Sequence, residues 1–380
     1  GVSGIVVGIL NSYDHFTVPA LSPVFWNLAI ILGLAIGVPH ASATSSKLYV
    51  YAGSILVATV VQVLLPMPWL KGRDGRLQLV LDWRDPAVKQ VFKLMVPVTL
   101  GLGLINVNAV IDSVFASRYI DKTLAPAAIS KAFLVYMLPQ GMFSVAVATV
   151  LFPPLARAAA RNDMAEFRRT MSAGLRQIAF LLIPAAAVSA VLAEPIIRIL
   201  FQRGNWHANQ TPVVAGALAA FSLGLFFNGA MLMLNRAFFS LKSNWVPTSV
   251  ALGNLGLNVV LDAVFYRFGV WGIPLSTSVC NVAGAIALVI LLRKRVGRFD
   301  GGAILSTIVR VSLASAAVAA VSYVVWHPLD GSLGRSFPAQ VVSVGAALLA
   351  AVAVYAIACR ALRVSEMQTL LSLRSRARRG

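Results

Sequence analysis

The chain has 380 residues, of which 58% are hydrophobic and only 12% are charged. A soluble globular domain carries about 25% charged residues, so this composition excludes an ordinary water-facing surface. A formal net charge of +19 would suggest a nucleic-acid partner in a soluble protein. In a chain this apolar it indicates membrane-protein topology instead, and we expect no nucleic-acid partner.

Apolar stretches long enough to cross a hydrocarbon core of about 30 Å, which takes about 20 residues, recur along the whole sequence. Residues 1–10 are apolar but too short to span, and they begin with Gly1 rather than Met. We therefore expect a piece of a longer protein that begins inside a helix. The ten predicted spans are 18–38, 48–68, 94–117, 127–153, 177–197, 211–236, 246–265, 270–292, 304–326 and 337–359. The predicted fold class is an all-α, polytopic membrane helix bundle.

Basic residues alternate between the two sides of this bundle. They gather in the loops 71–93, 157–176, 236–242 and 293–298 and in the tail 360–379, whereas the intervening loops hold few. By the positive-inside rule, the loops rich in Lys and Arg face the cytoplasm. We expect a multi-pass protein of the bacterial inner membrane with a cytoplasmic C-terminus, whose basic residues contact anionic lipid headgroups.

Two internal stretches are polar enough to lie outside the hydrocarbon. Residues 69–93 mix charge with turn residues and are the best candidate for a linker between two helical lobes. Residues 154–176 combine arginines with apolar side chains, which fits either a helix lying on the membrane or a basic loop held by anionic lipid. The only cysteines, Cys280 and Cys359, fall inside predicted spans, so we assign no disulfide, no metal ligand and no cofactor.

Ionisable groups inside predicted spans are costly and therefore mark candidate functional positions. Asp112 lies late in one span and Lys131 early in the next, on either side of a short turn. They could face each other or a shared cavity, or Lys131 could extend to the interface. We assign Lys131, Gln140 and Asn108 to a substrate-binding cavity, and expect most other intramembrane asparagines, Asn228 and Asn281 among them, to bond across helices.

Asn258 and Asp262 are four residues apart and so share one face of their helix. With Asp112 they could supply hard oxygen ligands for a small cation, or take up a proton. Thr277 and Ser278 on the following span could add oxygen atoms. The predicted cation site is Asp112, Asn258, Asp262 and Thr277, for Na⁺ or H⁺; the alternative is that Asp262 only marks a helix end beside Arg267.

Pro139 and Gly141 interrupt a predicted span near its middle. Proline removes a helix hydrogen bond and frees a carbonyl, which neighbouring polar groups such as Gln140 must satisfy. We interpret Pro139 and Gly141 as a hinge between two transport states; a static kink is the alternative.

Two stretches of the sequence carry distinctive motifs. Residues 8–27, GILNSYDHFTVPALSPVFWN, hold a Leu-Asn turn followed by Pro-Ala, Pro and Asn. Residues 136–157, YMLPQGMFSVAVATVLFPPLAR, are similar to the pattern Leu-Pro-x-Gly-x-Phe-x-Val-Ala-x-Ala-Thr-Val-Leu-x-Pro and give the sharper signal. Both stretches resemble segments of the MurJ (MviN) family of lipid II flippases.

The resemblance implies a two-lobe transporter of the multidrug/oligosaccharidyl-lipid/polysaccharide (MOP) exporter superfamily, related to MATE carriers. It implies fourteen helices in the family, of which this chain would begin in the fourth. The expected domains are a remnant of the N-terminal lobe with helices 5 and 6 (1–68), a cytoplasmic linker (69–93), a six-helix lobe of helices 7 to 12 (94–297), helices 13 and 14 (298–362) and a basic cytoplasmic tail (363–380).

In function, the resemblance implies a monomer, not an enzyme, that carries undecaprenyl-linked peptidoglycan precursor, lipid II, from the cytoplasm to the periplasm by alternating access. It also implies a sodium site between the seventh, eleventh and twelfth helices, where the predicted cation residues lie. The chain departs from the family at Leu134, where an Arg is common. Alternatives are a flippase for another polyprenyl-linked glycan, a MATE-like cation-coupled exporter, an inactive scaffold and, more remotely, a membrane-embedded polyprenyl-phosphate enzyme.

Overall fold

The computed structural model describes residues 2–13, 17–70, 85–203, 206 and 208–367. These residues form helices and connecting turns, without a strand. The chain divides into two compact units, residues 1–83 and 84–380. The boundary falls within the stretch 69–93, most of which lies outside the described residues.

The first unit is a helical hairpin with one short helix beside it. It comprises α1 (Val2–Ser12), α2 (Thr17–Gly37) and α3 (Thr44–Leu64), with 3₁₀ turns at Val38–His40 and Met67–Leu70. The helices α2 and α3 approach closely at Gly33, where a Cβ atom would lie 2.3 Å from Ser54 Oγ. A small residue at this position is what lets two membrane helices pack without side chains between them.

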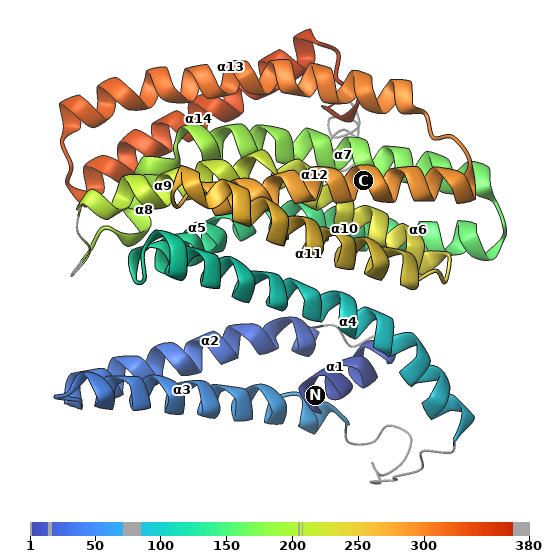
Figure 1. Cartoon of the computed structure of the whole chain (residues 1–380), viewed down its shortest axis with the longest axis horizontal. Helices are drawn as coiled ribbons and strands as arrows, with labels where there is room; N and C mark the ends of the chain where they lie inside the picture. The colour runs from blue at the N-terminus through green and yellow to red at the C-terminus, as the bar shows by residue number, and fades with distance from the viewer. Residues whose placement is uncertain (1, 14–16, 71–84, 204–205, 207, 368–380) are drawn as a thin grey trace, which may run out of the picture. The chain divides into compact units, whose positions relative to one another are not determined.

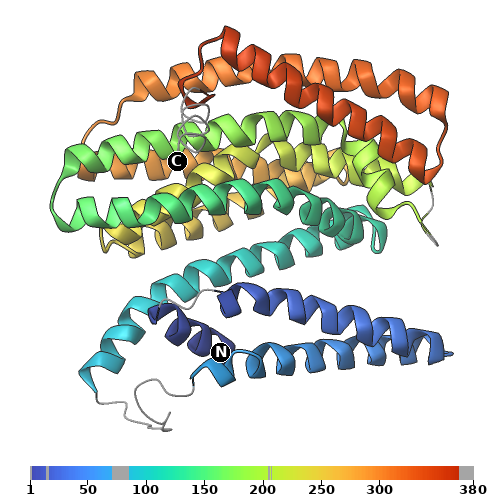
Figure 2. The same ribbon diagram turned by 180° about the vertical axis from the view of Figure 1, so that it is seen from behind.

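The second unit holds the remaining helices (Figure 1). They are α4 (Pro86–Phe115), α5 (Leu124–Pro139), α6 (Val145–Ala160), α7 (Met164–Val191), α8 (Ala193–Phe201), α9 (Thr211–Leu223), α10 (Leu225–Ser240), α11 (Trp245–Phe265), α12 (Gly272–Val296), α13 (Gly301–Leu333) and α14 (Phe337–Ala361). We call α4 to α12 the six-span lobe. The antiparallel helices α13 and α14 form a hairpin beside α7 on one side of this lobe, as Figures 1 and 2 both show.

Eight helices in the described residues are long and apolar enough to cross a membrane, and the bent pair α9–α10 makes a ninth. The one remaining predicted span, 94–117, lies in α4, whose 30 residues extend for about 45 Å at about 1.5 Å per residue. α4 begins at Pro86, so the first part of this helix occupies the end of the predicted linker. The expectation of a polytopic helix bundle is confirmed.

Helix ends follow local chemistry. Asp163 and Asp300 are the N-cap residues of α7 and α13, where each carboxylate accepts a backbone N–H, from Glu166 at 2.9 Å and from Ala303 at 3.1 Å. Gly297 and Gly334 follow the last residues of α12 and α13 with φ of 86° and 78°, a left-handed conformation that favours glycine.

The basic segment 154–176 is not a helix on the membrane surface. It is the end of α6, a tight turn and the first half of α7. Leu155, Phe167 and Met171 are fully buried in the core of the lobe. Their apolar face meets protein rather than lipid, so the interpretation of a surface helix is wrong.

The kink predicted at Pro139 is a π-helical turn. α5 ends at Pro139, residues Gln140–Ser144 form the turn, and α6 continues the same membrane span to Ala160. Gln140 is buried and its amide donates to Asn228 Oδ1 on α10 at 3.0 Å. The buried polar side chain of this irregular segment is thus paired with one from the neighbouring helix.

A second break divides α9 from α10 at Gly224, where the helix axis bends by 46°. Ser278 on α12 donates to the carbonyl oxygen atoms of Ala220 at 2.7 Å and Phe221 at 3.3 Å. A Cβ atom on Gly224 would lie 2.8 Å from Ser278 Cα, so only glycine permits this approach.

We expect Ser278→Ala to destabilise the lobe, because the freed Ala220 carbonyl would be buried without its donor, at a cost of about 1–3 kcal/mol. The measurement is the thermal unfolding midpoint of the purified protein in detergent. Ser249→Ala is the matched control, since the exposed Ser249 hydroxyl only donates within its own helix, to Trp245 at 2.9 Å. Equal midpoints for the two variants would contradict the prediction.

Candidate functional site

The candidate site lies where α4, α11 and α12 pack together in the six-span lobe. α11 and α12 are joined by a tight connection with Gly269 at φ 82°. At the start of α12, a Cβ atom on Gly272 would lie 2.0 Å from the carbonyl oxygen of Phe265. The two helices can therefore approach one another directly, which brings Asp262 on α11 to Ser276 on α12.

Two carboxylates and two amides form the centre of the site. With its amide nitrogen toward the acidic groups, Asn258 Nδ2 lies 3.0 Å from Asp112 Oδ1, 3.2 Å from Asp262 Oδ2 and 2.9 Å from Asn108 Oδ1, so its two N–H groups are shared among three acceptors. This orientation is assigned because the opposite one would point the Asn258 oxygen only at acceptors. The Asn108 amide donates in turn to Asp112 Oδ2 at 3.2 Å.

Hydroxyl groups of α12 complete the arrangement. Ser276 Oγ donates to Asp262 Oδ1, and it lies 3.2 Å from the Asn258 amide. Asp112 hydrogen-bonds with Thr277 and with Asp262. We call Asn108, Asp112, Asn258, Asp262, Ser276 and Thr277 the acidic cluster.

The two carboxylates of the acidic cluster are buried, and neither has a basic partner within the described part of the chain. Asp112, Asn258 and Asp262 are 7%, 1% and 0% exposed. None of the ion pairs formed within the described residues includes either aspartate. Two carboxylates in contact cannot both stay ionised without compensation, so the arrangement suits one small cation or one shared proton.

The four residues predicted to bind a cation, Asp112, Asn258, Asp262 and Thr277, lie together in this cluster. Asn108 belongs here too, one helical turn from Asp112, although the sequence placed it in a substrate cavity. Ser276 was missed. Its neighbour Ser278 lies outside the cluster, because its hydroxyl binds the carbonyls of the broken span.

The other predicted positions are separate from the cluster. Lys131 Nζ lies 5.1 Å from the ring centre of Phe201 and 4.8 Å from that of Trp206. It therefore makes cation–π contacts with the last residue of α8 and with the segment that follows, and among the described residues it forms no ion pair with Asp112.

The Gln140–Asn228 pair continues to a third helix. The Asn228 amide donates to Asn281 Oδ1 on α12 at 3.5 Å, so the expectation that Asn228 and Asn281 bond across helices is confirmed. Gly141, in the π-helical turn, has open space where a Cβ would stand. A hinge at Pro139 and Gly141 stays a prediction.

No group of three or more His, Cys, Asp or Glu side chains that could hold a metal ion occurs in the part of the chain that the structure describes. The acidic cluster instead offers oxygen atoms from two carboxylates, two amides and two hydroxyls. Such a donor set suits Na⁺ or H⁺ better than a transition metal.

The chain is similar to known proteins over most of its length. The family model of lipid II flippase MurJ matches residues 1–341. The chain belongs to the MurJ family. It is 30% identical over 311 residues to a probable lipid II flippase MurJ of Synechocystis sp., covering 80% of this chain and 58% of that one. It is 30% identical over 362 residues to a probable lipid II flippase MurJ of Rhizobium tropici, covering 93% of this chain and 66% of that one.

The fold is that of a solved MurJ structure in an inward closed conformation, with a TM-score of 0.71 and 23% identity over 95% of this chain and 71% of that one. The chain thus spans about three fifths of the length of the curated MurJ relatives named above. With its apolar helices, membership of the MurJ family makes the chain a multi-pass inner-membrane protein.

Proposed function

We propose that the chain is part of a flippase that moves lipid II from the cytoplasmic to the periplasmic leaflet by alternating access. The observation that carries this proposal is the match of the MurJ family model over residues 1–341. The task is transport with no covalent chemistry, performed by a monomer whose C-terminus is cytoplasmic. The basic loops and the start of the tail support this orientation and contact anionic headgroups.

The acidic cluster is the proposed coupling site, with Na⁺ or H⁺ as the coupling ion. Asp112 and Asp262 supply the charge, and Asn258 and Thr277 supply neutral oxygens. A bound cation screens the two carboxylates from each other, so α4, α11 and α12 pack more tightly when the site is filled. Ion binding and release then favour different arrangements of these helices, which is the requirement for coupling.

For the headgroup of lipid II, we propose Lys131 and Gln140 as cavity residues; Asn108, which the sequence also assigned to this cavity, lies in the acidic cluster instead. Lys131 would attract the diphosphate as a point charge, without the bidentate geometry of an arginine. Leu134, at a position where the family resemblance implies an Arg, is 60% exposed and adds no charge. Pro139 and Gly141 are the proposed hinge of this span.

The experiment that tests the function is complementation. The full-length gene is expressed in cells depleted of their own lipid II flippase, and lipid II accessible from outside the cell is measured. We expect growth and external lipid II to return. A stable, membrane-inserted protein that restores neither would exclude lipid II as its substrate and favour another polyprenyl-linked glycan.

A further inference from the structure

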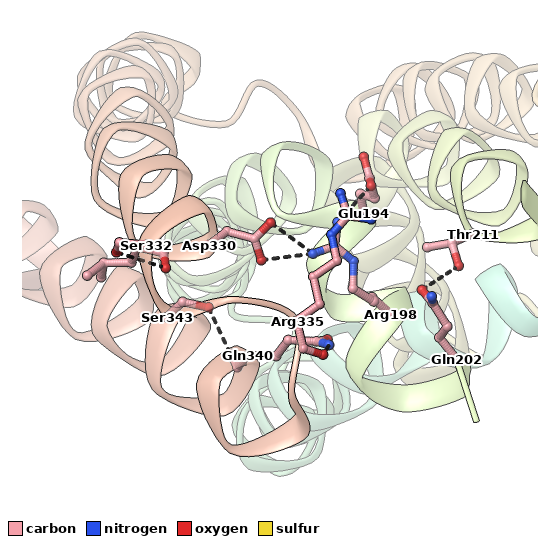
Figure 3. A network of polar contacts seen from close by, with 10 residues as sticks. Glu194, Arg198, Gln202, Thr211, Asp330, Ser332, Arg335, Gln340 and Ser343 are labelled. Carbon is pink, nitrogen blue, oxygen red and sulfur yellow. Dashed lines mark hydrogen bonds and ion pairs between the residues drawn. The ribbon is translucent and has the colours of Figure 1, made fainter. Parts of the chain in front are cut away.

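Arg198 is a buried arginine that joins α8 to the hairpin α13–α14. Its side chain is 5% exposed, and its Nη1 lies 2.8 Å and 2.9 Å from the two carboxylate oxygens of Asp330 on α13. Its Nη2 lies 2.9 Å from Glu194, one turn earlier on α8. Figure 3 shows the guanidinium between these two carboxylates. We call Glu194, Arg198 and Asp330 the α8 clamp.

The positive charge of Arg198 is compensated by the two carboxylates of the clamp. Burial alone would lower the pKa of the Arg198 guanidinium, but the hydrogen bonds and ion pairs to Asp330 and Glu194 raise it above its ordinary value. A buried charge that loses such a partner is strongly destabilised. The position of Asp330, and with it the end of α13, is therefore tightly constrained by Arg198.

α8 is in turn fixed to the other helices of the six-span lobe. After α8, Thr211 at the start of α9 donates to Gln202 at 3.1 Å and accepts from Trp206 Nε1 at 3.1 Å. Before α8, the fully buried Leu192 belongs to an apolar cluster with Trp326 of α13 and with Val344 and Ala347 of α14. α8 and the residues that flank it thus contact both the rest of the six-span lobe and the two helices of the hairpin.

The opposite end of the hairpin is also attached. Arg176 on α7 lies 3.2 Å from Glu366, which follows α14 and is buried. Arg310 on α13 donates to the carbonyl of Arg363 at 3.1 Å, which closes the two helices of the hairpin on each other. The hairpin is therefore attached to the rest of the protein by polar contacts at both ends and by apolar contacts with α7 between them.

We propose that the α8 clamp positions the hairpin α13–α14 on the six-span lobe, so that the hairpin and the lobe move as one rigid body while the carrier changes state. Arg198, Asp330 and Glu194 are positioning residues in this role. The inference rests on the proposed function only in assuming that the carrier changes state.

The test is a distance measurement between nitroxide labels in the full-length protein in lipid nanodiscs. One pair joins Ala127 on α5 to Val342 on α14, both exposed. All native cysteines, Cys280 and Cys359 among them, are replaced by alanine so that only the introduced cysteines are labelled. A second pair, Val60 on α3 with Val342, reports movement between the two units.

For the first pair, we expect one narrow distance distribution that does not change when lipid II is added. Asp330→Asn should produce a second, longer distance, because the guanidinium loses a charged partner and keeps only a neutral amide oxygen as acceptor. The exchanged variant Arg198→Asp with Asp330→Arg should restore the single distance, since the new arginine would meet both Glu194 and the new carboxylate. Arg198→Lys keeps the charge but loses the planar geometry, so we expect it to show the second distance in a smaller fraction of molecules than Asp330→Asn does.

The outcomes of these measurements distinguish failure of the rigid-body inference from failure of the proposed transport function. A single narrow distance in Asp330→Asn, or an unmodified protein whose first distance changes with lipid II, would overturn the rigid-body inference. An exchanged variant that behaves no better than Asp330→Asn would also contradict it, and this comparison holds even if Asp330→Asn is poorly folded. If lipid II changes neither distance in the unmodified protein, the result would count against the proposed transport function. If Asp330→Asn still shows two distances in that case, the clamp would be supported independently.

Discussion

Asp262→Asn is expected to remove the response of the protein to its coupling ion without unfolding the six-span lobe. Asp262 is fully buried, and its carboxylate contacts Ser276, Asn258 and Asp112. Asparagine keeps the size of the side chain and one acceptor oxygen, but it replaces the other oxygen with a donor and removes the charge. Because even indirect partners of a bound metal are typically worth 10–100-fold in affinity, we expect cation affinity to fall by roughly 100-fold or more.

The sign of the stability change distinguishes a coupling site from a structural one. Without a cation, Asp112 and Asp262 repel each other, so removing one charge should leave the cation-free protein equally stable or more stable. The unfolding midpoint of the unmodified protein should rise with Na⁺ concentration at constant ionic strength, since an ion that binds only the folded state stabilises it. This rise should be absent in Asp262→Asn, and transport should fall with it.

Asp163→Asn is the matched control, because Asp163 is an exposed N-cap at which asparagine serves equally well. It should retain both transport and the rise with Na⁺. A midpoint of the unmodified protein that responds to pH but not to Na⁺ would assign the proton instead. Undiminished transport with an unchanged ion response in Asp262→Asn would rule out the acidic cluster as the coupling site.

Gly272→Ala is expected to have the largest effect of a single methyl group in the lobe. The new Cβ would lie 2.0 Å from the Phe265 carbonyl oxygen and 2.9 Å from its carbonyl carbon, and these are backbone atoms that no rotamer change can move. Overpacking of this kind typically costs 1–3 kcal/mol and here we expect about 3 kcal/mol. α11 and α12 would separate at the end where Asp262 meets Ser276.

The variant should therefore lose thermal stability and ion response together, unlike Asp262→Asn, which loses only the second. Both are read from the same unfolding curves with and without Na⁺. Gly256→Ala on α11 is the control, because no atom lies within 4 Å of the position of its Cβ. A stable Gly272→Ala protein with an intact ion response would show that the connection between α11 and α12 can relax without opening the site.

Local sequence features predicted most of the membrane architecture and part of the site. Long apolar stretches predicted the spans, and a spacing of four residues placed Asn258 and Asp262 on one helix face. The same rule links Asn108 to Asp112 and could have added Asn108 to the acidic cluster. The choice among three consecutive residues, Ser276, Thr277 and Ser278, depends on the rotation of α12 about its axis, which only packing determines.

Features that depend on distant contacts could not be predicted. Local amphipathicity says that residues 164–171 have an apolar face, but not whether lipid or the core of the lobe covers it. Arg198 and Asp330 are separated by 132 positions, and each alone reads as a charge near a helix end. Lys131 likewise gave no signal that aromatic rings of a later segment would surround it.

The π-helical turn at Gln140–Ser144 has a consequence for the alignment of MurJ sequences. A π turn holds one residue more than the α-helical turn it replaces, and one residue corresponds to a rotation of about 100° about the helix axis. A relative in which this segment is plain α-helix must be one residue shorter here, or every downstream side chain of α6 would face a different neighbour. Single-residue gaps in this span are therefore expected only within residues 140–144, and their presence would distinguish carriers with a bulged helix from carriers with a regular one.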